Sequence, residues 1–173
     1  GTVGPDALPC EEGIKLLKPL VEAGKGAEAD PALLGNLMGG LFSRIEEGVK
    51  IGNEWICHDP YVQIDHATDP FDAFTKPTSN ESLLQFIEMI KEVNVPEWAE
   101  KVPNIPLFNI AGEEDPCGSF GEGVELVSKW LEDTGHDIDT MIYIGYRHEI
   151  HNYSDLKDQV EDDMIEFLDK IAK

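Results

Sequence analysis

The sequence predicts an α/β protein, and three observations support this prediction. Short apolar runs at 105–111 and 141–144 have the length and composition of buried strands. Between them, apolar residues recur at the spacing of one helix face: Phe120, Val124, Val127 and Leu131. Gly135 then follows as a natural helix end. A strand, a helix and a second strand within so short a segment predict a βαβ unit with parallel strands.

The chain before residue 76 is predicted to be helical, with glycine or proline at its interruptions. Helical apolar spacing occurs in three segments: 14–21, 33–38 and 41–49. Asp30 and Pro31 are expected to begin the second helix, and Gly39-Gly40 to end it. Residues 55–64 are expected to be irregular. Glycine-punctuated helices without a strand suit a mobile cover, so a helical cap or lid is predicted at 1–75.

Residues 76–173 are predicted to form the core domain. Thr78 and Glu81 have the spacing of a capping box, for a helix that ends near Asn94. Ser154 is the expected cap of the last helix. That helix has one apolar stripe, formed by Leu156, Val160, Met164, Phe167, Leu168 and Ile171. Its opposite face is almost entirely acidic, which indicates a solvated surface.

Composition excludes several functions. The net charge is −22, so the chain repels nucleic acid and anionic lipid surfaces. No apolar run approaches the length that crosses a bilayer. The three cysteines, Cys10, Cys57 and Cys117, lack CxxC spacing, which argues against a disulfide framework and a zinc site. No signal peptide is recognisable, and a cytoplasmic location is expected.

An acid and a histidine follow the two predicted strands. Asp115 comes just after the first strand, on a turn fixed by Pro116, and His148 comes four residues after the second. The carboxyl ends of adjacent parallel strands meet at one edge of a sheet, where ligands bind. A carboxylate that orients a histidine is two thirds of a nucleophilic triad. Glu113 and Glu114 are rival carboxylates in the same turn.

Other interpretations of these residues are less favoured. His148, Glu149 and His151 have the spacing H-E-x-H, which differs from the metal motif H-E-x-x-H. Cys117 is a poor nucleophile, because neighbouring acids raise the pKa of a thiol. The glycines at 118, 121 and 123 fit a tight helix start better than a phosphate loop. Four aromatic residues could line an acyl pocket, although ordinary cap packing is favoured: Trp55, Tyr61, Phe71 and Phe74.

The segment after residue 103 resembles α/β-hydrolases of the monoacylglycerol-lipase or lysophospholipase-like branch, often labelled serine aminopeptidases. The matching residues, in order, are Gly112, Asp115, Pro116, Gly118, Gly121, Gly123, Val124, Gly145, Arg147, His148 and Glu149. The resemblance implies that Asp115 is the triad acid and His148 the general base. It also implies that Pro116, Arg147 and Glu149 support the two turns.

The nucleophile of this family does not carry over. The elbow motif G-x-S-x-G is absent from all 173 residues. The nearest match, around Ser119, has Cys117 where the motif requires a glycine two residues before the serine. The resemblance therefore implies the C-terminal part of an α/β-hydrolase fold, with parallel strands flanked by helices, preceded by an α-helical cap. The N-terminal half of the core, which carries the elbow, is expected to lie outside this chain.

The expected function is that of a serine hydrolase without a cofactor, acting on small-molecule carboxylic esters, with lipid-like monoacyl esters favoured. The chain alone is expected to be inactive. Its expected partner is the missing half of the hydrolase, or a copy of itself along the sheet edge. Two alternatives remain open: a non-catalytic binding module on a split or decayed hydrolase, and an amide or thioester hydrolase of the same fold.

Overall fold

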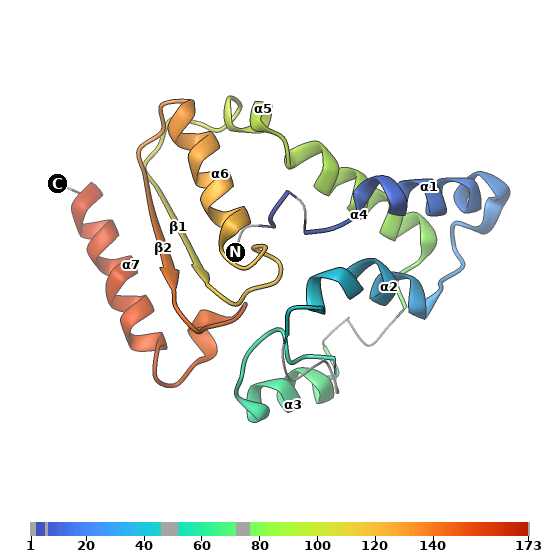
Figure 1. The fold of residues 1–173 in the computed structure, drawn as a ribbon, viewed down its shortest axis with the longest axis horizontal. Helices are drawn as coiled ribbons and strands as arrows, with labels where there is room; N and C mark the ends of the chain where they lie inside the picture. Colours follow the sequence, from blue (N-terminus) through green and yellow to red (C-terminus); the bar gives the residue numbers. More distant parts are fainter. Residues whose placement is uncertain (1–2, 6, 46–51, 72–76, 173) are drawn as a thin grey trace.

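The computed structural model describes residues 3–5, 7–45, 52–71 and 77–172 (Figure 1). The sheet lies at one end of the molecule and most of the N-terminal helices lie at the other. The elements in chain order are α1 Cys10–Leu20, η1 Val21–Lys25, α2 Pro31–Phe42, α3 Pro60–Thr68, α4 Asn80–Val93, α5 Pro96–Ala99, β1 Leu107–Gly112, α6 Glu122–Asp133, β2 Ile138–Tyr143, η3 Ile150–Asn152 and α7 Lys157–Ile171.

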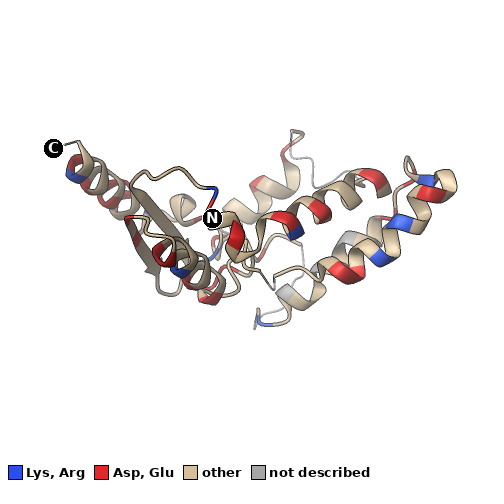
Figure 2. Cartoon of the chain, turned by 90° about the horizontal axis from the view of Figure 1, so that it is seen from above, with Lys and Arg blue, Asp and Glu red and all other residues tan. Residues whose placement is uncertain are grey.

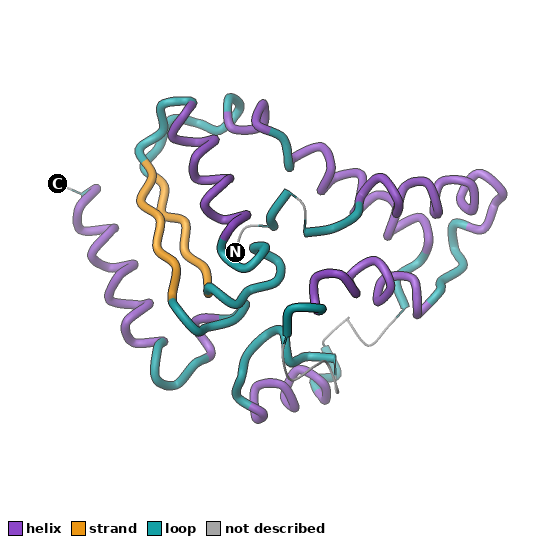
Figure 3. The backbone as a smooth tube through the Cα atoms, in the orientation of Figure 1, coloured by secondary structure: helices purple, strands orange, loops and turns teal. Residues whose placement is uncertain are grey.

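The βαβ prediction is confirmed. β1 and β2 pair in parallel, from Leu107 opposite Ile138 to Gly112 opposite Tyr143. Helices flank the two strands on both sides (Figure 3). Leu107 and Ile138 pack with α6, whereas Phe108 stacks on Phe167 of α7 with ring centroids 5.1 Å apart. Successive side chains of a strand point to opposite faces, so α6 and α7 cover the two faces of this sheet.

The element boundaries of the unit differ from the predicted ones. β2 begins at Ile138 rather than at 141, and Ile144 lies beyond its end with 71% of its surface exposed. The helix after β1 begins at Glu122, because Ser119 and Phe120 both have a positive φ and cannot be helical. Gly121, with φ of 85°, completes this sharp turn. The tight turn predicted before this helix thus consists of three consecutive residues with left-handed backbone conformation.

The N-cap residue of α2 is as predicted, but the helix ends later than predicted. The Asp30 carboxylate accepts a hydrogen bond from the Ala32 N–H at 2.9 Å. The helix then continues through Gly39-Gly40 to Phe42. Glycine weakens a helix by only about 0.5–1 kcal/mol, and burial of Leu37 between α1 and α4 offsets this cost. The predicted segment 41–49 lies partly outside the described residues.

The N-termini of three other helices differ from the prediction. The segment expected to be irregular overlaps α3, in which Asp59 caps the Tyr61 N–H at 2.8 Å and Pro60 is the first residue. Ser79, not Thr78, caps α4 by accepting from the Ser82 N–H at 3.3 Å. α7 begins at Lys157 without a side-chain cap, so Ser154 is not its N-cap.

Two hydrophobic clusters connect the predicted cap to the predicted core. The first joins residues of α1, α2 and α4: Leu17, Leu37, Leu83, Leu84 and Ile87. The second joins the segment before α3 to the region around β2 and α7: Ile45, Trp55, Ile56, Cys57, Tyr143, Ile150, Tyr153, Leu156 and Val160. Both clusters cross residue 75, and the division of the chain at that position stays a prediction.

The apolar stripe of α7 is only partly buried. Val160 is buried, whereas four apolar residues of this helix are exposed: Met164, Ile165, Leu168 and Ile171. An open groove of about 810 Å³ lies between α7 and the strands, lined in part by Phe108, Met141 and Phe167. Within the described residues, β1 is hydrogen-bonded to β2 alone, which leaves its other edge unpaired.

Acidic residues occur on almost all of the helices, and basic residues are few (Figure 2). The chain has 35 acidic and 13 basic residues, so its carboxylates far outnumber the cations that could pair with them. In the described part of the chain, no helix combines the length and the apolar character needed to cross a membrane.

Candidate active site

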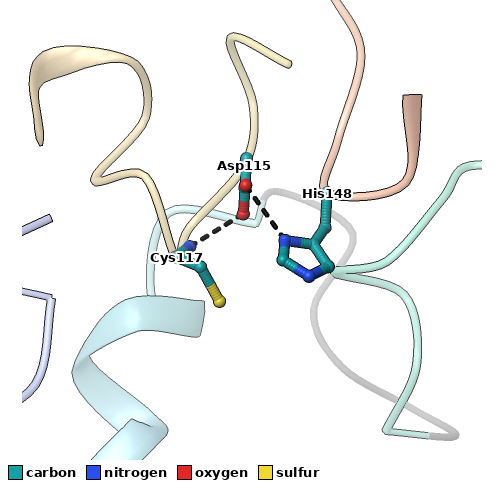
Figure 4. Close-up of side chains that lie close together, drawn as sticks. All are labelled: Asp115, Cys117 and His148. Atoms are coloured by element: carbon teal, nitrogen blue, oxygen red, sulfur yellow. Dashed lines mark hydrogen bonds and ion pairs between the residues drawn. The ribbon is translucent and has the colours of Figure 1, made fainter. Parts of the chain in front are cut away.

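Asp115 and His148 lie together at the carboxyl ends of the strands, as predicted. The His148 Nδ1 atom is 3.0 Å from Asp115 Oδ2 (Figure 4). The Asp115 side chain is 1% exposed and the His148 side chain 31%. The acid is therefore shielded, whereas the imidazole is partly exposed to solvent. This geometry suits an acid that orients a base, and the catalytic role of each residue stays a prediction.

Backbone contacts between the two turns hold this pair in place. The Glu113 N–H donates to the Tyr143 carbonyl at 2.9 Å, and the Glu114 N–H to the Tyr146 carbonyl at 2.8 Å. A Cβ atom at Gly112 would overlap the carbonyl oxygens of Tyr146 and Arg147. Glycine is therefore needed at the end of β1, because the acid turn and the histidine turn are in direct contact there.

The acid turn also fixes the orientation of the Asp115 carboxylate. Its Oδ1 accepts a hydrogen bond from the Cys117 N–H at 2.9 Å, which leaves Oδ2 for His148. Pro116, which was predicted to support the turn, is fully buried. Each carboxylate oxygen of Asp115 thus has its own hydrogen-bond donor, and the two bonds together fix the orientation of the carboxylate.

The two rival carboxylates have other partners. Glu113 Oε2 accepts from the Gly145 N–H at 3.0 Å. Glu114 Oε2 lies 3.1 Å from His58 Nε2 and 3.5 Å from Arg147 Nε. Of the three acids, Asp115 is the one that contacts His148.

Arg147 and Glu149, the predicted supporting residues, contact the segment before and within α3. Arg147 is 3% exposed, and its Nη1 donates to the Glu54 carbonyl at 2.6 Å. Glu149 Oε2 lies 3.0 Å from His66 Nε2, and the Glu149 N–H donates to the Ile56 carbonyl at 3.0 Å. The histidine turn is therefore attached on both sides of His148 to residues 54–66.

Tyr153 is a residue of this site that the sequence did not reveal. Its hydroxyl oxygen accepts from the backbone N–H groups of His58 at 3.0 Å and of Arg147 at 3.1 Å. The same oxygen lies 2.9 Å from His58 Nδ1. Burial raises the pKa of Tyr153, so the hydroxyl is neutral. An aromatic residue several positions beyond the motif gives no sequence signal for such a contact.

The four aromatic residues considered for an acyl pocket behave differently. Trp55 is buried and contacts both Phe42 and His148, with ring centroids 5.9 Å and 4.8 Å away. Tyr61 is 82% exposed and Phe71 93%. Phe74 lies outside the described residues. Trp55 therefore packs against His148 and the cluster around Tyr153, whereas Tyr61 and Phe71 are exposed, and an acyl pocket formed by these residues stays a prediction.

Cys117 lies beside the pair, and its thiol is a poor nucleophile, as predicted. Burial, and secondarily the charge of Asp115, raise the pKa of Cys117 to about 12. A thiol with this pKa carries almost no thiolate at neutral pH.

Comparison with solved structures gives the wider fold. The chain superposes on a highly thermostable carboxyl esterase from Bacillus coagulans, in complex with glycerol, with a TM-score of 0.90 and 46% identity. It also superposes on a lipase in its open form, with a TM-score of 0.80 and 32% identity. The fold is part of an α/β-hydrolase fold.

The match covers nearly all of this chain but only part of each hydrolase. It includes 99% of this chain and 55% of the esterase, and 92% of this chain and 51% of the lipase. The chain thus spans about half the length of the structures that it matches. No family model matches the sequence, and no curated protein matches it.

Proposed function

We propose that this chain supplies the acid and the base of a serine hydrolase that acts on carboxylic esters. The observation that carries the proposal is the Asp115–His148 hydrogen bond, in a fold shared with a carboxyl esterase and a lipase. The intact bond also argues against a decayed binding module, since an unused pair has no reason to keep both members in contact.

The two residues would act as follows. An ionised carboxylate can only accept hydrogen bonds, so the proton between Asp115 and His148 belongs to Nδ1 of the imidazole. His148 Nε2 is then free to take the proton of an attacking serine and to return it to the leaving alcohol. Asp115 holds this tautomer and stabilises the imidazolium that forms.

The nucleophile is proposed to lie outside the 173 residues, because neither nearby candidate suits the role. Ser119 Oγ occupies the space where a Cβ at Gly4 would lie, so it packs against the N-terminal segment. Cys117 is protonated, and Figure 4 shows the second nitrogen of His148 pointing away from Asp115. A segment with a G-x-S-x-G elbow would place a serine at that second nitrogen.

The partner proposed for this chain is the N-terminal half of the same hydrolase. The free edge of β1 could pair with a further strand, and the exposed apolar residues of α7 could pack on the added layer. We call the polypeptide that contains both halves the completed hydrolase. Sedimentation of residues 1–173 alone should show self-association through this edge, and a monodisperse monomer would contradict the proposed partner.

The proposed substrates are lipid-like monoacyl esters. The family resemblance is the main support. In addition, α3 is attached to the histidine turn through His66 and Glu149, and it exposes the apolar side chains of Tyr61 and Ile64. An exposed apolar surface on a helix attached to the histidine turn suits an acyl chain. We expect kcat/KM to rise with acyl length in a series of p-nitrophenyl esters, and to be higher for monoacyl than for triacyl glycerols.

The test uses the completed hydrolase with single substitutions. His148→Ala should abolish ester hydrolysis, and Asp115→Asn should lower kcat by about 10⁴-fold, because the wrong tautomer is then favoured. Glu113→Gln is the matched control, since it removes an adjacent charge but keeps an acceptor for the Gly145 N–H. Near-normal turnover of either site variant would refute the assignment.

A further inference from the structure

Three different metal-binding side chains meet at the candidate active site. A carboxylate oxygen of Asp115, the Cys117 sulfur and a ring nitrogen of His148 all lie within 4.8 Å of one another. The three residues come from the two turns that follow β1 and β2, and Figure 4 shows the sulfur on the same side of the acid turn as the imidazole. The spacing of the cysteines argued against a zinc site, because none of these three residues belongs to a metal motif in the sequence.

The distances are close to those of a tetrahedral site. With bonds of about 2.0–2.3 Å to zinc, neighbouring O, N and S ligands lie roughly 3.3–3.6 Å apart. His148 Nδ1 and Asp115 Oδ2 are already 3.0 Å apart. All three ligand atoms lie within 4.8 Å of one another, so a shift on the order of 1 Å would bring them to these distances. His148 is partly exposed, so an ion can enter and a water molecule can take the fourth position.

We propose that Asp115, Cys117 and His148 form a binding site for Zn²⁺ or another thiophilic divalent ion, and that occupation of this site blocks the base. Binding replaces the Nδ1 proton of His148 by the ion. The neutral imidazole then carries its proton on Nε2, where it can no longer accept a proton from a nucleophile. Only this blocking effect rests on the proposed function, whereas binding of the ion does not.

The proton balance of the binding step can be measured. The Cys117 thiol releases its proton to the buffer as the sulfur–metal bond forms. The His148 proton moves from Nδ1 to Nε2, so the imidazole releases none. Each bound ion should therefore release about one proton, and no oxidant or reductant is involved.

The donor set also predicts which ions bind. Thiolate and imidazole favour Zn²⁺ and Cd²⁺, whereas Mg²⁺ and Ca²⁺ prefer all-oxygen sites. Inhibition by Zn²⁺ or Cd²⁺ without inhibition by Mg²⁺ would distinguish this site from general screening of the negative charge of the chain.

The binding test uses the 173-residue chain, titrated with Zn²⁺ by calorimetry and with Cd²⁺ by ultraviolet absorption. The wild type should bind one ion at this site, with a cadmium–thiolate charge-transfer band. Cys117→Ser should lose the band and weaken Zn²⁺ binding at least tenfold. Cys10→Ser is the matched control, because Cys10 is also a partly exposed free cysteine but lies outside the site. A full band in Cys117→Ser, or its loss in Cys10→Ser, would overturn the proposal.

The inhibition test uses the completed hydrolase and compares each variant with and without Zn²⁺. The Zn²⁺ concentration that halves the activity should be at least tenfold higher for Cys117→Ser than for the wild type or for Cys10→Ser. If Cys117→Ser does not fold, His148→Ala is the second variant, and it should weaken Zn²⁺ binding at least tenfold whereas Cys10→Ser should not. Binding without inhibition would refute the blocking effect, and an inactive completed hydrolase would refute the proposed function while leaving the binding result intact.

Discussion

The indole of Trp55 packs against the imidazole of His148, with ring centroids 4.8 Å apart and planes inclined by 47°. Trp55 is 8% exposed and belongs to the cluster that also contains Tyr153 and Ile150. Asp115 therefore holds one edge of the imidazole while Trp55 packs against its ring. A residue far from the histidine in sequence thus restricts the rotation of the proposed base.

Trp55→Ala should destabilise the protein and disorder the imidazole. Removal of a buried tryptophan costs about 3–5 kcal/mol in the free energy of unfolding, which urea denaturation of the completed hydrolase would measure. Trp130 is the matched control, because it is only partly buried and lies on α6, and Trp130→Ala should cost less and leave kcat unchanged. Equal effects of the two substitutions would contradict a role for Trp55 at the site.

Gly112→Ala should separate the two turns. The added methyl group would overlap the Tyr146 and Arg147 carbonyl oxygens, and such overpacking costs about 1–3 kcal/mol. The Asp115–His148 bond should lengthen, so kcat should fall with the stability. Gly39→Ala in α2 is the control, since nothing lies within 4 Å of its added methyl group, and it should stabilise the helix slightly. Thermal unfolding and ester hydrolysis of both variants test this prediction.

Tyr153→Phe should loosen the attachment of the histidine turn to residues 54–66. The substitution removes the acceptor of two backbone N–H groups, and each buried donor left without a partner costs about 1–3 kcal/mol. Tyr61→Phe, at an exposed tyrosine of α3, should have almost no effect. If the two variants have the same denaturation midpoint, the Tyr153 hydroxyl does not hold the turn.

Hydrogen exchange should show a mobile N-terminal region. Amides of α1 and α2 are expected to exchange faster than those of β1, β2 and α6, because in the described part of the chain no strand packs on these helices and their cluster is small. Residues 55–57 are the expected exception, since they pack in the cluster around Tyr153. Equal protection across α1, α2 and the strands would contradict a lid in this region.

The sequence revealed the features that depend on local pattern. The βαβ unit follows from apolar spacing, and the meeting of Asp115 and His148 follows from their positions after parallel strands. The Asp30 cap is an equally local signal. α3 begins with the same Asp-Pro pair, but its apolar residues do not form a buried stripe, so its helical character was missed.

The remaining contacts depend on tertiary packing between distant segments. Trp55 reaches His148, Tyr153 reaches His58, and the Cys117 sulfur lies near the imidazole, yet none of these pairs has a characteristic spacing. In α7, by contrast, a local pattern was present but the expected burial was not found. Its sequence predicts a buried stripe, and within the described residues Leu168 and Ile171 are exposed because no element covers them.

If these residues are the acid–base half of a serine hydrolase, a separate half that carries the nucleophile should restore activity. The measurement is the rate of p-nitrophenyl butyrate hydrolysis by residues 1–173, alone and after addition of a separately expressed hydrolase half that carries the G-x-S-x-G elbow. We predict no turnover by either half, and turnover by the mixture that His148→Ala abolishes. Turnover by residues 1–173 alone that depends on His148, or a stable but inactive complex of the two halves, would contradict the claim.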